Sequence, residues 1–439
     1  MYRIKSDKCA SAVLAGIFFF SFNAETATIE STAIVDMRHT DNAKLVPDNE
    51  VNELVVSARV GAKIDSGSGP FQFNANTLLS YQHYTQDTFG DQQYFNLDAT
   101  AGWEMIKNRL DWNMQDFFSQ QFINSLDPST PDNIQDTNVF TFGPNIYFPI
   151  SARQSITLQP EYRNFSYEVQ DIDNQQNSLN ASWSYQMFPT LNVGLAGEVN
   201  SVDYDEESIS DTTFRNIHLI VSRKLPRSVY SVKLGLTRAD RESGGSVRGL
   251  TGAITWVLNL TGASNLYTSI SSDVTDTNRN LLHVSRSPET GDFSNEQIST
   301  EILRNSVAKL TYRREDAKLK SSVWVEFDEQ DYEQASLGRE VQVAGLKFDY
   351  SVTPTVTAGV YGQYDHTKLT DTGREDYLYT VGSIINYRLS RKLHSKVDIK
   401  YRNKDSTLDI SDFSEMSIFV SLVYGYGQAA HASNIGGGL

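Results

Sequence analysis

Two-residue alternation of apolar and polar side chains recurs along this chain, and it constrains the fold more than any other feature. Residues 95–103, 178–186 and 416–424 each follow this pattern over about nine positions. Successive residues of a β-strand point to opposite faces of a sheet, so each segment predicts a strand with one apolar and one polar face. Strands of about ten residues with this period are typical of a transmembrane β-barrel.

The connections between these segments alternate strictly between short and long. Residues 66–70, 106–109 and 389–392 are examples of nine tight turns, and ten longer, polar and acidic stretches fall between them. We therefore predict an all-β fold, a closed antiparallel transmembrane barrel of about twenty strands, with eighteen as the alternative. Closure is required because every backbone amide in lipid needs a partner. A large β-sandwich with aromatic cores is the less favoured alternative, since it has no need of charged inner faces.

The N-terminal segment has the layout of a secretory signal peptide. Basic residues precede an apolar stretch from Ala10 to Phe22, and small residues follow near positions 24–27. That stretch is too short to cross a membrane as a helix. We expect residues 1–27 to be the signal peptide, residues 28–426 the outer-membrane barrel and residues 427–439 a C-terminal periplasmic tail.

Charge and the scarcity of chemical motifs exclude several classes of function. The formal net charge is −16, which disfavours nucleic-acid binding. The single cysteine, Cys9, lies in the signal segment, and the seven histidines form no metal-binding pair such as H-E-x-x-H. We expect no enzyme, no catalytic residues, no metal site and no cofactor. A catalytic triad assembled from separate strands is the least favoured alternative.

Charged side chains fall on the faces that a barrel would turn toward its lumen. The candidate lumen-lining residues are Lys318, Lys320, Lys347, His394, Lys396, Asp398, Lys400 and Arg402. A barrel of about twenty strands encloses an aqueous lumen. The basic residues of the later strands then predict one of two walls: a positive stripe suited to an anionic polymer, or a solvated wall whose neighbours cancel its charge.

Two further features bear on the strands. Pro144 and Pro160 lie inside candidate strands, where each removes a ladder hydrogen bond, so we expect bulges or strand ends there.

Aromatic residues cluster beside the short turns, and others, such as Phe117 and Tyr401, lie roughly a strand length away. The two groups predict the aromatic girdles at the two membrane interfaces.

Four segments carry a family resemblance: Asp41 to Leu45, Gly338 to Lys368, Tyr387 to Thr407 and Ser414 to Tyr426. They resemble an outer-membrane β-barrel family, porin-like, that is often encoded with exopolysaccharide and exosortase gene clusters. The resemblance covers essentially the whole mature chain and carries no catalytic residues. One departure is the thirteen-residue stretch after Tyr426, because such barrels usually end on an aromatic last strand.

The resemblance implies a role in export or assembly of an exopolysaccharide, as conduit or accessory. The expected location is the cell outer membrane, with membrane lipid and lipopolysaccharide as partners. An acidic polysaccharide and periplasmic export proteins are further expected partners. Two alternatives stay open: a general porin for small solutes, and a structural surface barrel whose lumen is plugged by the loop from Thr275 to Glu296.

Overall fold

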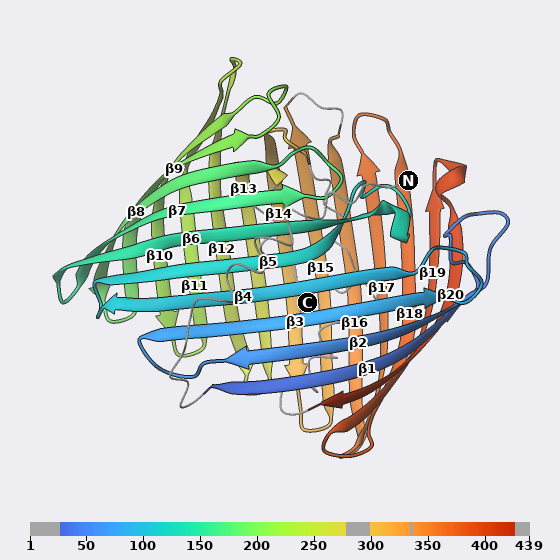
Figure 1. Cartoon of the computed structure of the whole chain (residues 1–439). Helices are drawn as coiled ribbons and strands as arrows, with labels where there is room; N and C mark the ends of the chain where they lie inside the picture. Colours follow the sequence, from blue (N-terminus) through green and yellow to red (C-terminus); the bar gives the residue numbers. More distant parts are fainter. Residues whose placement is uncertain (1–26, 278–298, 334–336, 426–439) are drawn as a thin grey trace.

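The computed structural model describes residues 27–277, 299–333 and 337–425, which form one closed ring of twenty antiparallel strands (Figure 1). The strands are β1 (Thr28–Thr40), β2 (Glu53–Asp65), β3 (Phe71–Tyr84), β4 (Gln92–Ile106), β5 (Leu110–Phe122), β6 (Ile134–Ser151), β7 (Gln154–Tyr167), β8 (Asn174–Phe188), β9 (Leu191–Tyr204), β10 (Thr212–Leu225), β11 (Ser228–Arg241), β12 (Ser246–Thr261), β13 (Ser264–Thr275), β14 (Leu303–Glu315), β15 (Leu319–Tyr332), β16 (Arg339–Thr353), β17 (Val356–Leu369), β18 (Glu375–Arg388), β19 (Leu393–Ser406) and β20 (Phe413–Gly425).

Every strand pairs with its neighbours in the sequence, and β1 closes the ring on β20. The closing ladder runs from Thr32 opposite Gly425 to Thr40 opposite Ser417. Closure leaves no free sheet edge, which is what a sheet in lipid requires. The predicted all-β barrel of about twenty strands is confirmed, and the alternative of eighteen strands is wrong.

Short and long connections lie at opposite ends of the barrel. The long ones carry two short helical turns, η1 (Pro131–Asn133) and η3 (Asp409–Ser411). Because the strand number is even, β1 begins and β20 ends at the end with the tight turns. Among the described residues, no helix is long and apolar enough to cross a membrane.

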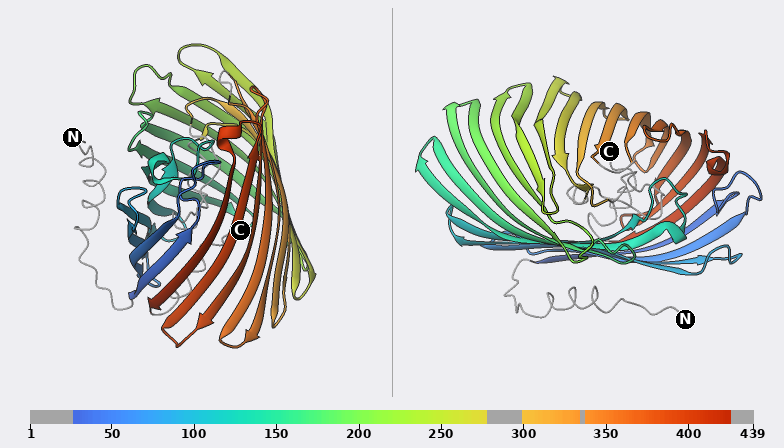
Figure 2. Two further views of the ribbon diagram at one scale, coloured as in Figure 1. Left: turned by 90° about the vertical axis from the view of Figure 1, so that its right-hand side faces the viewer. Right: turned by 90° about the horizontal axis from the view of Figure 1, so that it is seen from above.

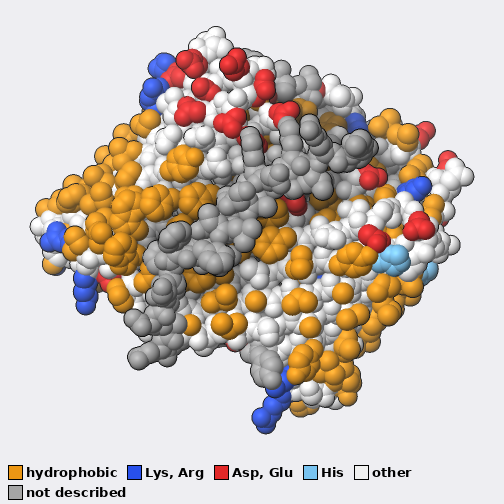
Figure 3. Space-filling view, in the orientation of Figure 1, with side chains coloured by type: hydrophobic (Ala, Val, Ile, Leu, Met, Phe, Trp, Pro, Cys, Tyr) orange, Lys and Arg blue, Asp and Glu red, His pale blue; other side chains and the backbone are white. Residues whose placement is uncertain are grey.

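The outer face of the strands is apolar and exposed, and the inner face is polar. On β19, Ile399 and Tyr401 point outward, with about 41% and 44% of their surface exposed. Lys400, which lies between them in the sequence, points inward and is half-buried. Figure 3 shows hydrophobic side chains spread around the middle of the surface and carboxylates gathered at one end. An apolar surface of this extent suits lipid, not water.

The ring is flattened in cross-section. Figure 2, seen from above, shows the blue to teal strands as a nearly flat wall, with the green to red strands curving over it. The twenty strands are long, between 12 and 18 residues, as tilted strands of a membrane barrel must be.

The two strand prolines cause neither a bulge nor a strand end, which corrects the expectation from the sequence. Pro144 lies inside β6 and Pro160 inside β7, and both strands continue past them. The ladder has the same register before and after them, from Phe142 opposite Tyr162 to Ile146 opposite Leu158, but the pairs in between are missing. The prolines therefore open the ladder locally without shifting it.

The prediction that Phe117 belongs to an outer girdle is also wrong. Phe117 packs instead against a buried cluster of Val139, Phe165 and Tyr167 on the inner face. The predicted signal peptide, the C-terminal tail and most of the proposed plug from Thr275 to Glu296 lie outside the described residues.

Candidate functional site

The inner faces of β3 to β9 form a wall rich in carboxamides. They enclose a cavity of about 570 Å³. Its polar lining side chains include Gln72, Asn74, Asn113, Gln115, Asn145, Gln159, Asn180, Thr100, Thr141 and Ser178, with the charged Glu161, Arg163 and Glu198. We call this surface the carboxamide wall. Each carboxamide presents a donor and an acceptor without net charge, so uncharged hydrogen-bonding groups outnumber the charged side chains in this lining.

Some of the carboxamides are held in position by hydrogen bonds within the wall. Asn145 donates through Nδ2 to Asp111 at 2.8 Å and accepts from Gln159 Nε2 at 2.8 Å. Three buried polar atoms in the same lining, Thr141 Oγ1, Arg163 Nε and Asn180 Oδ1, have no hydrogen-bond partner within the described chain. Positioned amides beside unpaired polar atoms give the wall spare capacity to bind hydroxyl groups.

The opened ladder between β6 and β7 lies in this wall. Gly143, Pro144 and Pro160 all line the cavity. A Cβ atom at Gly143 would lie 2.3 Å from the Pro160 carbonyl oxygen, so only glycine fits between the two strands there. The wall strands thus approach closely at the very point where their hydrogen-bond ladder is interrupted.

The inner faces of β14 to β20, continued by β1 and β2, form a second wall that is charged. We call it the charged wall. Its ion pairs include Lys309 with Glu326 at 2.9 Å, Lys347 with Asp349 at 3.8 Å, Lys396 with Asp398 at 3.9 Å, Arg402 with Glu415 at 2.5 Å, Lys404 with Asp376 at 3.0 Å and Arg59 with Asp36 at 2.5 Å. The cations of this wall are largely matched by neighbouring carboxylates.

One contact in the charged wall spans three strands. The Tyr361 hydroxyl on β17 donates to Asp398 Oδ1 on β19 at 2.9 Å. It crosses β18 at Gly382, where a Cβ atom would lie 2.3 Å from the Tyr361 ring. Glycine at this position therefore lets the ring lie across the intervening strand and orient the carboxylate.

The predicted lumen residues divide into two groups. His394, Lys396, Asp398, Lys400 and Arg402 share the inner face of β19. Lys347 lies on the inner face of β16, and Lys320 lies on β15 near the short turns, paired with Glu315 at 2.5 Å and largely exposed. Lys318 corrects the prediction, because it lies in the exposed turn before β15 and not on the strand.

A loop that the sequence did not single out folds into the lumen. Residues 123–133, between β5 and β6, reach the far wall, where Arg339 Nη1 donates to Ser125 Oγ at 3.3 Å. Ser129 and Pro131 of the same loop line a small cavity together with Arg402 and Glu415 of the charged wall. We call residues 123–133 the inward loop. It narrows the lumen at its long-loop end.

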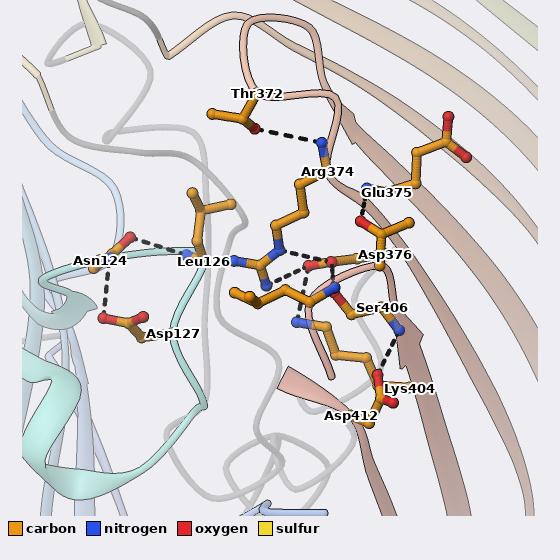
Figure 4. Close-up of polar contacts among 12 residues, drawn as sticks. Asn124, Leu126, Asp127, Thr372, Arg374, Glu375, Asp376, Lys404, Ser406 and Asp412 are labelled. Atoms are coloured by element: carbon orange, nitrogen blue, oxygen red, sulfur yellow. Dashed lines mark hydrogen bonds and ion pairs between the residues drawn. The ribbon is translucent and has the colours of Figure 1, made fainter. Parts of the chain in front are cut away.

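The rim of the charged wall opposite the inward loop is a tight ionic network. Arg374 donates to both oxygens of Asp376 at 2.8 Å, and Lys404 and the Ser406 hydroxyl contact the same carboxylate. Figure 4 shows this network, formed by Arg374 just before β18 and by residues of β18 and β19, with Asn124, Leu126 and Asp127 of the inward loop on the other side of the view. The described part of the chain holds no group of three or more side chains suited to a metal ion.

The closed ring, its apolar exterior and its polar lumen define a porin-like outer-membrane β-barrel, and the predicted location in the cell outer membrane is confirmed. Residues 304–426 match the family model described as "Putative beta-barrel porin 2". The predicted resemblance to a porin-like barrel family is thereby confirmed, with a match over residues 304–426 where the whole mature chain was expected. Its association with exopolysaccharide stays a prediction. A comparison with curated proteins finds no match.

Several solved structures are similar to the chain. The FrpB iron transporter from Neisseria meningitidis (F3-3 variant) is 8% identical, with a TM-score of 0.49 over 90% of this chain and 82% of that one. The siderophore receptor PirA from Pseudomonas aeruginosa is 11% identical, with a TM-score of 0.47 over 91% and 80%. OccK2 (OpdF) from Pseudomonas aeruginosa, solved with glucuronate, is 11% identical, with a TM-score of 0.43 over 92% and 99%.

Proposed function

We propose that this barrel is a non-enzymatic conduit in the outer membrane for a hydroxyl-rich chain, an exopolysaccharide on its way out of the cell. The carboxamide wall is the observation that carries the proposal. Each amide can donate a hydrogen bond to one sugar hydroxyl and accept a hydrogen bond from another. Because such amides recur on neighbouring strands, the same hydrogen-bonding groups recur along the lumen. Many weak and similar contacts favour entry of a polymer without trapping it.

The charge of the lumen narrows the substrate class. The predicted positive stripe would attract an anionic polymer, but the cations of the charged wall face carboxylates at 2.5–3.9 Å. Paired charges attract a polyanion only weakly. This supports the second alternative from the sequence, a solvated wall in which neighbouring side chains cancel the charge. We therefore favour a neutral or weakly acidic glycan over a strongly acidic one. Periplasmic export proteins would deliver it at the end with the short turns.

Planar-bilayer recording with neutral oligosaccharides tests the proposal. We expect neutral glucan oligomers to block the current transiently, with longer blocks for longer chains. Gln115→Leu with Asn180→Leu removes two wall amides, each contributing about 0.5–1.5 kcal/mol, so the blocks should shorten by roughly tenfold. Asn177→Leu, on the outer face of β8, is the matched control and should leave the block time unchanged.

Deletion of the gene separates the polymer from smaller solutes. If surface polysaccharide is unchanged while uptake of small solutes falls, the polymer proposal is wrong. A general porin for small solutes is then the better function. The inward loop favours that second candidate, because a narrowed lumen is how a diffusion channel limits solute size. A plugged structural barrel would instead give no conductance and no sugar-induced block.

A further inference from the structure

Three arginines stand in register on the outer face of the barrel. Arg215 on β10 lies opposite Arg238 on β11, and Arg238 lies opposite Arg248 on β12. They share their face with Leu236 and Leu250, which are about 57% and 75% exposed. All three guanidinium groups therefore start from the lipid-facing surface and not from the lumen. We call them the arginine row.

The arginine row marks one boundary of the apolar band. On β10, Arg215 and Arg223 lie on the same outer face, with only Ile217, Leu219 and Val221 between them on that face. Eight residues of strand span roughly 26 Å at about 3.3 Å per residue, which is roughly 20 Å along the membrane normal for a strand tilted by about 40°. The apolar band of an outer-membrane barrel is about 25 Å tall. Arg215 thus lies at the interface on the long-loop side, and Arg223 at the opposite interface.

Like charges directly opposite each other on adjacent strands repel and destabilise a sheet. Asp240 offsets part of this repulsion, because it accepts hydrogen bonds from Arg238 Nε at 2.7 Å and from Arg215 Nη1. Arg248 has no ion pair within the described chain. Three arginines and one aspartate leave a net charge of +2 (3 − 1) at a single level of the membrane surface.

We propose that the arginine row is a binding site for a phosphate group of an outer-leaflet lipid, the phosphorylated glucosamine headgroup of lipopolysaccharide. A phosphate monoester carries about −1.5 to −2 charges and three acceptor oxygens, which matches the net charge of the row. Guanidinium groups bind phosphate through paired, charge-assisted hydrogen bonds. The level of the row, at the end of the apolar band, is where such a headgroup lies. The site is independent of what passes through the lumen.

Lipid retention measured by native mass spectrometry tests this site. Purified barrel would be exchanged into detergent with diphosphorylated lipid A, or with lipid A from which the phosphates have been removed. We expect wild type to retain the diphosphorylated lipid, and the double variant Arg238→Gln with Arg248→Gln to retain it at least tenfold less. Arg223→Gln, at the other interface of the same outer face, should retain it normally.

Three results would overturn the proposal. Equal retention of phosphorylated and dephosphorylated lipid A would show that acyl chains alone hold the lipid. Displacement of bound lipid A by millimolar inorganic phosphate would indicate a site for a free anion. A double variant that retains lipid A but loses self-association would assign the row to a contact between barrels. Heat-modifiable migration of each variant on gels checks that all of them are folded.

Discussion

Ser125 Oγ accepts a hydrogen bond from Arg339 Nη1 at 3.3 Å, although β5 and β16 lie almost opposite each other in the ring of twenty strands. Arg339 is only about 3% exposed, and its Nε also donates to Gln330 at 3.0 Å. The inward loop is therefore held in two ways. Its ends are joined to β5 and β6, and its Ser125 is bound by the buried Arg339 guanidinium on the opposite side of the lumen.

Arg339→Ala should release the inward loop and widen the lumen. We expect the single-channel conductance in planar bilayers to rise severalfold, with larger current fluctuations as the loop moves. Ser125→Ala removes one hydrogen bond, worth about 0.5–1.5 kcal/mol, and should have a smaller effect in the same direction. Lys320→Ala changes a largely exposed cation near the other end and serves as the control. Unchanged conductance in Arg339→Ala would mean that the loop does not set the width.

Arg402→Gln should destabilise the barrel far more than Lys320→Gln. Arg402 pairs with Glu415, which is about 3% exposed and also accepts from Thr40, so the substitution removes the cation in direct contact with a buried carboxylate. Breaking a buried pair costs about 3–5 kcal/mol of folding free energy when no other charge compensates, and Arg38 and Lys400, which also interact with Glu415, should place the loss at the lower end of that range. The exposed pair of Lys320 with Glu315 contributes about 0–1 kcal/mol. Urea-dependent folding in detergent micelles measures both, and equal losses would contradict the expectation.

Lys396→Glu combined with Lys400→Glu should make the channel prefer cations. The two positions face the lumen on β19, where Lys396 lies 3.9 Å from Asp398. Reversing both charges leaves Asp398 beside two new carboxylates, so the wall changes from nearly balanced to strongly negative. The reversal potential in a salt gradient reports this shift directly. Lys318→Glu, in the exposed turn, should shift it much less.

Gly382→Ala should weaken the contact between Tyr361 and Asp398. The added Cβ would lie 2.3 Å from the end of the Tyr361 ring, which must move away from the carboxylate. We expect a loss of about 1–3 kcal/mol in folding free energy, as for overpacking. The loss should largely vanish in a Tyr361→Leu background. At Gly362 the nearest atoms would lie 3.8 Å away, so Gly362→Ala should be tolerated.

The barrel itself was predictable because its signals are local. Alternation along residues 393–402 assigns each side chain to a face, and tight turns such as residues 389–392 fix where strands end. Neither requires knowledge of distant parts of the chain. The strand prolines show the limit of local rules, since Gly143 lets β6 pass Pro160 without a change of register.

The site was predictable only in part. The inner face of β19 follows from alternation, but the partners that neutralise it do not, because Glu415 meets Arg402 through the pairing of separate strands. The carboxamide wall is visible in the sequence as asparagine and glutamine at alternate positions, as in residues 72–76. The sequence gives no comparable sign of the inward loop. Its polar residues would suit a loop outside the barrel equally well, and its direction is set by Arg339, far away in the sequence.

The interrupted ladder between β6 and β7 has a consequence for the exchange of backbone protons. The missing rung between the pairs Phe142–Tyr162 and Ile146–Leu158 would join Pro144 to Pro160, and neither residue has an N–H to donate. The Tyr147 amide donates to Arg109 on the β5 side, so the amides of Gly143 and Asn145, at alternate positions of the same strand, also point to the intact β5 ladder. The gap therefore leaves two carbonyl oxygens without a ladder partner but frees no amide proton, and deuterium exchange should stay slow through this part of the wall.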